Sequence, residues 1–486
     1  MLRPWDIQFS FEDSPAKTLH SKLLNCITAD IKNGRLAAGV MLPGTRSLAK
    51  QLGINRKTVQ QVYEELEAQG WLKSKLRSGT FVSEIMPEQG LSASDSSLIN
   101  NTIKTKPSSE LAENLYLDAV ALADCVSITN DGTPDARLIP YELLARTYRR
   151  VCVNLSRQAR LGYGDPRGAI ELRNSIQKML FSDRFINCSN QDICIVRGSQ
   201  MGIYLASRIL DAKKGAIIME ELSYLPAHAA FEANGFKIIK CRLDEQGLDI
   251  DHLREILSTN EVSGIYVTPH HQYPTTVCLP MQRRLALLEL SKRYQFSVIE
   301  DDYDHEFHYE ANPIPPLASL PNSENVVHIG SMSKVFAPGL RLGYIVADTR
   351  FIERAAQEIV LIDRQGNTIT EHVIADLMDS GEVKRHIRKV RREYKARRDH
   401  TAKEFTRLFK GKATFLLPTG GLAIWVDISK LVTGKNIADF NNSDSTLNTF
   451  FAAEQKTPTH IRFGFGAISM DEITRSIEKL ADELIT

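Results

Sequence analysis

The sequence IGSMSKVFAPGLRLGY, residues 329 to 344, places a single lysine, Lys334, just after an apolar run. The run NVVHIG that leads into it is typical of a buried strand, and Gly and Pro follow the lysine. An amine traps an aldehyde only while it is neutral, and desolvation and nearby cations keep it neutral by lowering its pKa. Arg341, seven residues on, supplies such a charge. The stretch therefore predicts a lysine placed at a strand end for covalent chemistry.

The aldehyde that this pattern favours is pyridoxal phosphate (PLP), held by Lys334 as a Schiff base. Ser331, Ser333 and Arg341 would then lie near the phosphate. A surface turn is the alternative for so short a motif, so the choice between them depends on the rest of the chain.

A glycine turn upstream predicts a second phosphate contact. DICIVRGSQMGIYLASRIL, residues 192 to 210, has the pattern of a strand, a turn and a helix. Gly198, Ser199 and Gln200 therefore place backbone N–H groups at a helix N-terminus, where phosphates bind. Alone, the pattern also fits a short polar loop.

A carboxylate and two tyrosines complete the predicted cofactor site. FSVIEDDYDHEF, residues 296 to 307, ends a strand at Asp301, and a buried carboxylate there keeps a pyridine nitrogen protonated. Tyr303 is placed to donate to the phenolate oxygen of the ring. Tyr224, in EELSYLPAH, is a candidate to stack on the ring face.

The same acidic segment allows a competing interpretation as a metal site. The side chains that suit it are Asp301, Asp302, Asp304, His305 and His308. Metal sites need ligands that converge, and most carboxylate-rich loops are solvated. The strand-end position of Asp301, 33 residues before Lys334, favours the cofactor, and we expect no metal.

Composition indicates an ordinary globular protein of two or three domains. The chain has 486 residues, of which 43% are hydrophobic and 24% charged, and its net charge is +1. Residues 1 to 83 hold 12 Lys and Arg against 7 Asp and Glu, so a basic head precedes a slightly acidic body. The start, MLRPWDIQFS, lacks the apolar core of a signal peptide, and no apolar run approaches the ~20 residues of a membrane span. Seven scattered cysteines without a C-x-x-C pair favour reduced thiols, and we expect a cytoplasmic protein without a membrane partner.

The basic head has helix-turn-helix spacing. Apolar residues at 19, 23, 27 and 31 predict a first helix that Asn33 and Gly34 end. TRSLAKQLGINRKTVQQVYEELEAQGW then predicts two short helices around a turn at Gly53, the second capped by Asn55. WLKSKLRSGTFVS follows as a two-stranded wing.

Several head residues are candidates for DNA contact because they suit base edges or phosphates. Those on the second helix of the pair are Arg56, Lys57, Thr58 and Gln60, and those on the wing are Lys73, Lys75 and Arg77, with Gly79 in its turn. A small helical domain with a solvated basic face is the alternative. Helix pair, basic first turn and basic wing together favour DNA.

The body has the alternating pattern of an α/β domain. Apolar runs such as DICIVRG, GAIIME, VSGIYVTP, FSVIEDD and NVVHIG alternate with helical periods from about Leu115. This predicts a parallel sheet covered on both faces, with ligands at the carboxyl ends of its strands. Residues 84 to 114, rich in Ser, Asn and Thr, separate it from the head, either as a flexible linker or as an ordered strap.

The head resembles the winged helix-turn-helix of the GntR regulators over nearly all of residues 1 to 83. The segment that carries the resemblance is IKNGRLAAGVMLPGTRSLAKQLGINRKTVQQVYEELEAQGWLKSKLRSGTFV. In that family the arginine after the L-P-x-x turn and the one that opens the recognition helix contact DNA. They correspond to Arg46 and Arg56 here.

The body, residues 115 to 486, resembles the fold-type I aminotransferases. The resemblance implies that Lys334 is the Schiff-base lysine, Asp301 the pyridine-nitrogen aspartate, Tyr303 the O3′ tyrosine and Arg341 the phosphate arginine. It also implies that Arg462, in HIRFGFG, holds a substrate carboxylate by a two-pronged contact. Because these enzymes build each site at a dimer interface, it further implies a homodimer.

Head, linker and body together resemble the MocR subfamily of regulators, also called the GabR-like group. The loop TPHHQYPTTVCLP departs from that subfamily, since His270 stands where a small residue is common and Thr276 replaces a glycine. Aminotransferases carry Asn-Pro in this loop, which His271 and Gln272 do not supply, and this weakens the case for full transamination.

The favoured hypothesis is a PLP-dependent transcription regulator whose body senses a small amino compound, or PLP itself, and whose head binds operator DNA. Two alternatives stay open. One is an aminotransferase with an accessory DNA-binding head, and the other is a structural DNA-binding protein whose cofactor fold no longer binds PLP. Keto-acid formation would distinguish the aminotransferase from the regulator. Absence of cofactor absorbance would identify the structural DNA-binding protein.

Overall fold

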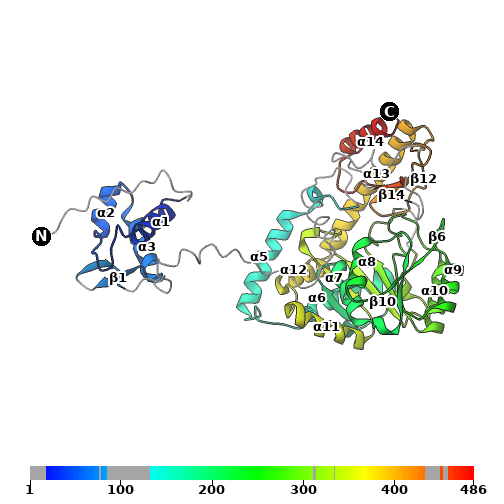
Figure 1. The fold of residues 1–486 in the computed structure, drawn as a ribbon, viewed down its shortest axis with the longest axis horizontal. Helices are drawn as coiled ribbons and strands as arrows, with labels where there is room; N and C mark the ends of the chain where they lie inside the picture. The colour runs from blue at the N-terminus through cyan, green and yellow to red at the C-terminus, as the bar shows by residue number, and fades with distance from the viewer. Residues whose placement is uncertain are drawn as a thin grey trace. The chain divides into compact units, whose positions relative to one another are not determined.

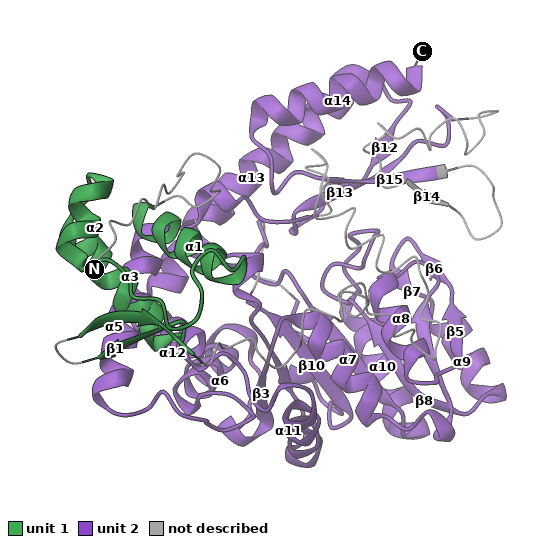
Figure 2. Ribbon diagram, turned by 60° about the vertical axis from the view of Figure 1, so that its left-hand side comes forward, with its two compact units in different colours: residues 1–111 green, residues 112–486 purple. Residues whose placement is uncertain are grey.

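The computed structural model of this chain describes residues 18–75, 78–84, 132–309, 314–332, 334–432, 449–451 and 458–485. The chain divides into two compact units, residues 1–111 and 112–486 (Figure 2). The predicted linker after Glu84, and the candidate residues Arg77 and Ser333, lie outside the described residues. No helix in the described ranges is long and apolar enough to cross a bilayer.

The smaller unit has the predicted helix-turn-helix with a two-stranded wing. Its elements are α1 (Leu19–Lys32), α2 (Thr45–Leu52), α3 (Arg56–Ala68), β1 (Leu72–Lys75) and β2 (Gly79–Val82) (Figure 1). Gly53 ends α2 with φ +65°, and the Asn55 side chain accepts a hydrogen bond from the Lys57 amide, so it caps α3 as predicted.

The core of this unit confirms most of the predicted periodicity. Leu23, Ile27 and Ile31 of α1 are buried against Val59, Val62 and Leu66 of α3. The predicted helix begins at Leu19, as the spacing indicated, although Leu19 itself is 54% exposed at the first position of α1.

The larger unit is built on a seven-stranded sheet in the order β3-β11-β10-β9-β8-β4-β5. The strands are β3 (Ile193–Val196), β4 (Ala216–Glu220), β5 (Ile238–Cys241), β8 (Val262–Val267), β9 (Ser297–Asp302), β10 (Val326–Ser331) and β11 (Gly343–Val346). All five quoted apolar runs form strands of this sheet. The five strands from β10 to β5 are parallel as predicted, whereas β11 is antiparallel to both of its neighbours.

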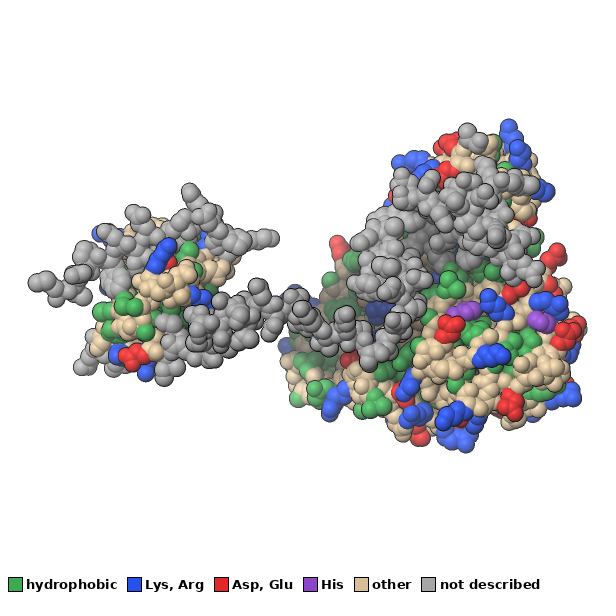
Figure 3. All heavy atoms as spheres, in the orientation of Figure 1, with side chains coloured by type: hydrophobic (Ala, Val, Ile, Leu, Met, Phe, Trp, Pro, Cys, Tyr) green, Lys and Arg blue, Asp and Glu red, His purple; other side chains and the backbone are tan. Residues whose placement is uncertain are grey.

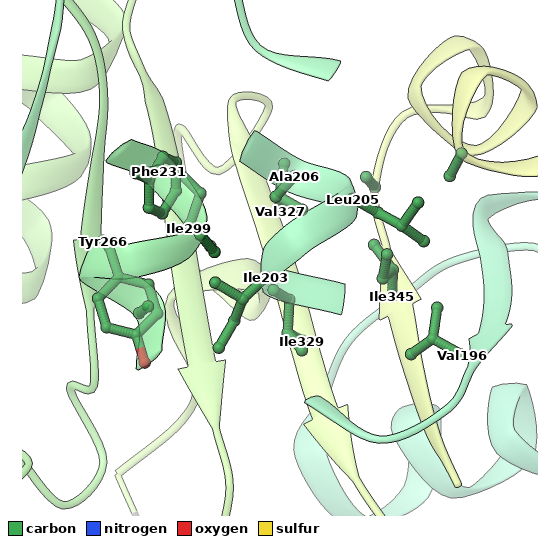
Figure 4. Close-up of a cluster of buried hydrophobic side chains, with 14 of the residues drawn as sticks. Val196, Ile203, Leu205, Ala206, Phe231, Tyr266, Ile299, Val327, Ile329 and Ile345 are labelled. Atoms are coloured by element: carbon green, nitrogen blue, oxygen red, sulfur yellow. The ribbon is translucent and has the colours of Figure 1, made fainter. Parts of the chain in front are cut away.

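Helices cover both faces of the sheet, as the continuous apolar runs predict. The helices are α5 (Tyr141–Arg157), α6 (Ile170–Arg184), α7 (Ser199–Ile209), α8 (Leu225–Ala233), α9 (Ile250–Thr259), α10 (Met281–Tyr294), α11 (Thr349–Asp363) and α12 (Thr368–Asp379). On one face Ile203 and Ala206 of α7 pack against Ile299, Ile329 and Ile345 of three strands (Figure 4). On the other face, α9 and α10 pack on β4, β8, β9 and β10, while α6 and α12 pack on β3 and β11.

A second, four-stranded sheet lies in the C-terminal part, in the order β12-β13-β15-β14. Its strands are β12 (Thr414–Phe415), β13 (Ala423–Asp427), β14 (Thr449–Phe451) and β15 (Pro458–Gly464). The long α13 (Glu382–Phe409) and α14 (Met470–Ile485) pack on it through a core that includes Phe405, Phe463 and Leu480. A short hairpin, β6 (Leu243–Asp244) and β7 (Gly247–Leu248), completes the strands.

Basic and acidic side chains are interspersed on the face of the larger unit that Figure 3 shows. This agrees with the near-neutral composition of the body. None of the cysteines that the structure describes forms a disulfide; they are Cys26, Cys152, Cys188, Cys194, Cys241 and Cys278.

Candidate functional site

Two neighbouring parallel strands bring the predicted lysine and carboxylate together. In the register of β9 and β10, Asp301 lies opposite Ile329, five residues before Lys334. After β10 ends at Ser331, the chain turns and places Nζ of Lys334 4.5 Å from the centroid of the Tyr303 ring. Lys334, Asp301 and Tyr303, separated by up to 33 residues, thus occupy one site.

Asp301 has one oxygen bound and one without a partner. Its side chain is buried, and Oδ2 accepts a hydrogen bond of 2.7 Å from the hydroxyl of Tyr266. Oδ1 is buried and makes no hydrogen bond. Burial raises the pKa of Asp301 to about 6, and the charge of Asp302 adds to this, while the Tyr266 hydrogen bond and the charge of Lys334 oppose it. An orphaned carboxylate oxygen with these neighbours fits a protonated ring nitrogen.

The predicted phosphate turn has the geometry of a backbone cradle. Gly198 is the N-cap of α7 with φ +78°, a conformation that favours glycine. A Cβ at this position would lie 2.8 Å from Nη2 of Arg341. That Nη2 donates to the carbonyl of Arg197 at 3.0 Å, so the guanidinium lies against the first turn of α7. Ser331, at the end of β10, is buried. The N-terminal amides of α7 and the Arg341 cation are the donors that a phosphate needs.

Three further predicted residues have partners within the protein. The hydroxyl of Tyr303 donates to the carbonyl of His271 at 2.8 Å. Tyr224 precedes α8, and its ring meets that of Tyr273 edge to face at 5.6 Å. Nε2 of Gln200 donates to the carbonyl of Pro226 at 3.0 Å, and its buried Oε1 has no partner. The roles of these side chains toward a cofactor stay predictions.

Arg462 lies beside the lysine although it comes from the second sheet. It is buried on β15, Nη1 donates to the carbonyl of Pro274 at 2.8 Å, and the guanidinium lies 4.9 Å from the Tyr273 ring centroid. A Cβ on Gly132 would lie 3.6 Å from Nη2 of Arg462 and 3.8 Å from Nζ of Lys334. The two cationic groups therefore face the same point, where an anionic group of a small molecule fits.

Sequence reasoning missed Gly132, Tyr266 and Tyr273. Tyr266 lies in β8, inside an apolar run. The signal that could have identified it is a tyrosine hydroxyl near the end of a predicted strand. Gly132 and Tyr273 carry no motif, and only the folded chain brings them to Lys334 and Arg462.

The loop after β8 is fixed by a buried glutamine. Nε2 of Gln272 donates to Glu220 at 3.1 Å and to the carbonyl of Leu222 at 2.7 Å, and its Oε1 accepts from Thr275. Burial raises the pKa of Glu220 to about 8. Thr276, which replaces the expected glycine, has φ +62°. Left-handed backbone at a β-branched residue is strained, so the substitution retains the glycine conformation at a cost.

The candidate DNA-contact residues lie on the surface of the smaller unit. Those that are exposed are Arg46, Arg56, Lys57, Gln60, Lys73, Lys75 and Gly79, and Thr58 is half-buried. Gln60 donates to Glu64 at 2.9 Å, and Nζ of Lys75 lies 5.1 Å from the Phe81 ring centroid. Ser74 donates twice to Glu67, which ties β1 to α3. The first turn of α3 and the wing thus present cations to solvent, as a DNA-binding surface requires.

Comparison with known families agrees with this two-part organisation. Residues 132–480 match the family described as aminotransferase class I and II, and residues 20–82 match the gntR family of bacterial regulatory proteins.

Curated relatives include both regulators and an enzyme. The chain is 26% identical over 466 residues to the uncharacterized HTH-type transcriptional regulator YdfD of Bacillus subtilis, covering 95% of each chain. It is 27% identical over 384 residues to the probable rhizopine catabolism regulatory protein MocR of Rhizobium meliloti, covering 78% of this chain and 75% of that one. It is 28% identical over 386 residues to aromatic-amino-acid aminotransferase 1 of Thermococcus litoralis, covering 77% of this chain and 91% of that one.

A solved structure with the same body fold is the kynurenine aminotransferase of Pyrococcus horikoshii, determined in complex with PMP. It superposes with a TM-score of 0.69 at 26% identity, over 80% of this chain and 98% of that one. An archaeal alanine:glyoxylate aminotransferase superposes with a TM-score of 0.68 at 26% identity, over 76% of this chain and 94% of that one.

Proposed function

The chain belongs to the aminotransferase class I and II family and carries a GntR-type helix-turn-helix domain, and we propose that it is a MocR-like, PLP-dependent transcription regulator. Its body senses a small amino compound, or PLP itself, and its head binds operator DNA. The relatives named as transcriptional regulators, which match the chain across both units, support this assignment.

One observation carries the cofactor part of the proposal. Asp301 is buried with an unpartnered Oδ1, and Lys334 comes from the end of the adjacent parallel strand. Burial raises the pKa of such a carboxylate, and its ionised form destabilises the folded protein unless a ligand pairs with it. A ring nitrogen that donates to Oδ1 is such a ligand.

Each residue of the site has a separate proposed contact with the cofactor. When bound, PLP supplies an aldehyde that condenses with primary amines, so the proposed effector is a small amino compound. Lys334 holds the cofactor covalently, and Asp301 holds the proton of the ring nitrogen. The amides at Ser199 and Gln200, together with Arg341, would hold the phosphate beside Gly198, whose own amide donates to the carbonyl of Val196 at 2.9 Å. Ser331, Ser333, Tyr303 and Tyr224 are proposed as further contacts.

Arg462 is the group proposed to bind the effector carboxylate. It is buried, it faces the same point as Lys334, and Nη2 lies on the side of Gly132. A buried guanidinium binds a carboxylate with two parallel hydrogen bonds, which favours amino acids over simple amines.

The head contributes operator binding. Arg46, Arg56, Lys57, Thr58 and Gln60 are proposed to face the major groove and its flanking phosphates. The wing cations Lys73, Lys75 and Arg77, with the backbone at Gly79, are proposed to contact phosphate.

We also propose that the body forms a homodimer and that the protein works in the cytoplasm. Val360, Leu361 and Ile362 near the end of α11 are 50%, 76% and 52% exposed, and three adjacent exposed apolar residues are typical of an interface. A two-fold dimer also suits an operator with repeated half-sites. Sedimentation at micromolar concentration tests the dimer.

A second candidate function is an aminotransferase with an accessory DNA-binding head. The proximity of Arg462 to Lys334 and the similarity to a named aminotransferase favour it. Steady-state keto-acid formation from an amino-acid panel separates the two, because a regulator binds the effector without sustained turnover.

The cofactor assignment is tested on purified protein loaded with PLP. We expect visible absorbance and, after borohydride reduction, a phosphopyridoxyl mass on the peptide that contains Lys334. Lys334→Ala should abolish the adduct, and Lys292→Ala, at an exposed position of α10, should leave it intact. An adduct on another lysine contradicts the assignment.

A further inference from the structure

A cluster of three buried side chains adjoins the proposed cofactor site and has no role in it. His270 follows β8, Asp302 ends β9, and His305 follows three residues later. Their metal-ligating atoms all lie within 4.8 Å of one another. The three residues are only 5%, 2% and 4% exposed, so solvent does not satisfy their polar atoms.

Each of the three side chains has a polar atom without a hydrogen-bond partner. These atoms are Nδ1 of His270, Oδ1 of Asp302 and both ring nitrogens of His305. Buried polar atoms are nearly always paired, and a group of unpaired ones in one place indicates a missing shared partner. The two rings lie with centroids 4.6 Å apart at an interplanar angle of 31°.

The local charges favour a cation as that partner. Oδ2 of Asp302 contacts Nη1 of Arg184 at 2.9 Å and Nδ1 of His305 at 3.1 Å, which leaves Oδ1 for another ligand. Nη2 of Arg184 also forms an ion pair with Oε1 of Glu306 at 2.6 Å, so one guanidinium pairs with two carboxylates.

We propose that His270, Asp302 and His305 form a binding site for a divalent transition-metal ion, with zinc as the ion of best fit. Two imidazoles and a carboxylate are donors that zinc accepts in a tetrahedral set with one open position. A tetrahedral ion with bonds of about 2.0–2.2 Å holds its ligand atoms about 3.4 Å apart. Binding therefore draws the cluster together by up to about 1.4 Å, which small side-chain rotations supply.

The geometry selects a different set from the one that the sequence suggested. Oδ1 of Asp304 contacts Nδ1 of His271 at 2.7 Å, and His308 is engaged by the carbonyl of His305 at 3.0 Å and by Arg391 at 3.3 Å. Asp301 faces Tyr266. The expectation of no metal considered only residues 301–308, whereas the convergent set includes His270 from the loop after β8.

The site adjoins the cofactor residues along both strands. Asp302 follows Asp301 directly, and His270 precedes His271, whose carbonyl accepts from Tyr303. An ion bound by His270 and Asp302 thus joins the loop after β8 to the end of β9, and both segments carry proposed cofactor contacts.

The test uses the full chain, stripped of metal with a chelator and prepared without cofactor, so that it does not depend on PLP binding. After dialysis against micromolar zinc, metal analysis should give one ion per chain. His270→Ser and His305→Ser should each weaken binding by at least about 10-fold. His308→Gln is the matched control, because its ring belongs to the same segment but contacts Arg391, and it should bind within about twofold of wild type.

Cobalt(II) gives a second measurement that needs no variant. The wild-type protein should develop the intense visible absorption of a tetrahedral site, which zinc then abolishes by displacement. The proposal is overturned if wild type retains no ion, or if both serine variants bind zinc as tightly as wild type. Asp302→Asn is unsuitable as the main test because it also breaks the contact with Arg184.

Discussion

Asp301 and Asp302 are adjacent and equally buried, yet they face different partners. Asp301 accepts a hydrogen bond from Tyr266, and the charge of Lys334 lowers its pKa. Asp302 instead contacts Arg184 and His305. Successive residues of a strand point to opposite faces, so one face of β9 serves the cofactor site and the other serves the histidine cluster. The motif identified Asp301 because of its distance from Lys334. No spacing rule brings His270 to Asp302, since that contact depends on strand order.

Because the pKa of Asp301 is raised, Asp301→Asn should increase the free energy of unfolding by an amount that depends on pH. The folded pKa of about 6 lies above the ordinary value, so ionised Asp301 costs stability above about pH 6 and nothing below about pH 4. Two pKa units correspond to on the order of 3 kcal/mol. In metal-free, cofactor-free protein, the unfolding free energy of Asp301→Asn relative to wild type should rise by about that amount from pH 4 to pH 8, measured by urea denaturation.

Two comparisons separate this from a structural role. Tyr266→Phe removes the hydrogen bond that lowers the pKa of Asp301, so the stability of this variant should continue to fall to a higher pH than that of wild type, and the total fall should be larger. In cofactor-loaded protein the sign reverses, and Asp301→Asn should release PLP more readily than wild type. A pH-independent difference between variant and wild type contradicts the buried-carboxylate account.

Thr276 predicts a stabilising substitution. Its φ of +62° is costly for a β-branched residue, and its amide donates to the carbonyl of Gln272 at 2.7 Å, a bond that glycine keeps. Thr276→Gly should stabilise the protein by about 1 kcal/mol, measured by thermal unfolding. Thr275→Gly is the control, and it should destabilise, because it removes the 2.6 Å hydrogen bond to Gln272. Loss of stability in both variants would show that the loop does not store this strain.

At the scale of elements, the apolar runs predicted the parallel strands and the coverage of both sheet faces. They did not predict β11, because GYIV is short and follows the lysine turn directly, so its antiparallel insertion between β3 and β10 depends on tertiary pairing. In the head, Asn55 and the periodicity of Val59, Val62 and Leu66 specified α3 correctly. Capping chemistry is local, which is why it is readable from sequence.

The exposed first turn of α3 predicts a specific effect on DNA binding. Arg56 opens the helix and is exposed, so Arg56→Ala should cost about 1–3 kcal/mol of operator affinity if it contacts a base edge. Lys73→Ala, on the wing, should weaken operator and random DNA alike and reduce the salt dependence of binding. Fluorescence titration with both DNAs at several salt concentrations measures this. Equal losses for Arg56→Ala on both DNAs would reassign Arg56 to a phosphate.

At the scale of the whole molecule, the sequence predicted a basic head and an α/β body, and the two compact units match that division. The predicted boundaries at residues 84 and 114 stay predictions, because residues 85–131 lie outside the described part of the chain. Arg462 shows what motif spacing alone does not supply. Its position beside Lys334 depends on how the second sheet is placed relative to the end of β10, which only the folded chain specifies.

The central claim is that an amine bound in the body changes how the head engages DNA. A ligand shifts a conformational equilibrium only by its different affinity for the two states, and couplings of about 1–3 kcal/mol are typical. The most direct measurement is a pair of titrations on one PLP-loaded preparation, amine with and without operator DNA, then operator with and without amine. The two shifts in affinity must be the same factor, about 5–150-fold, and Lys334→Ala should abolish both. If the amine binds at the cofactor while operator affinity stays unchanged, the sensing account is contradicted and the aminotransferase account replaces it.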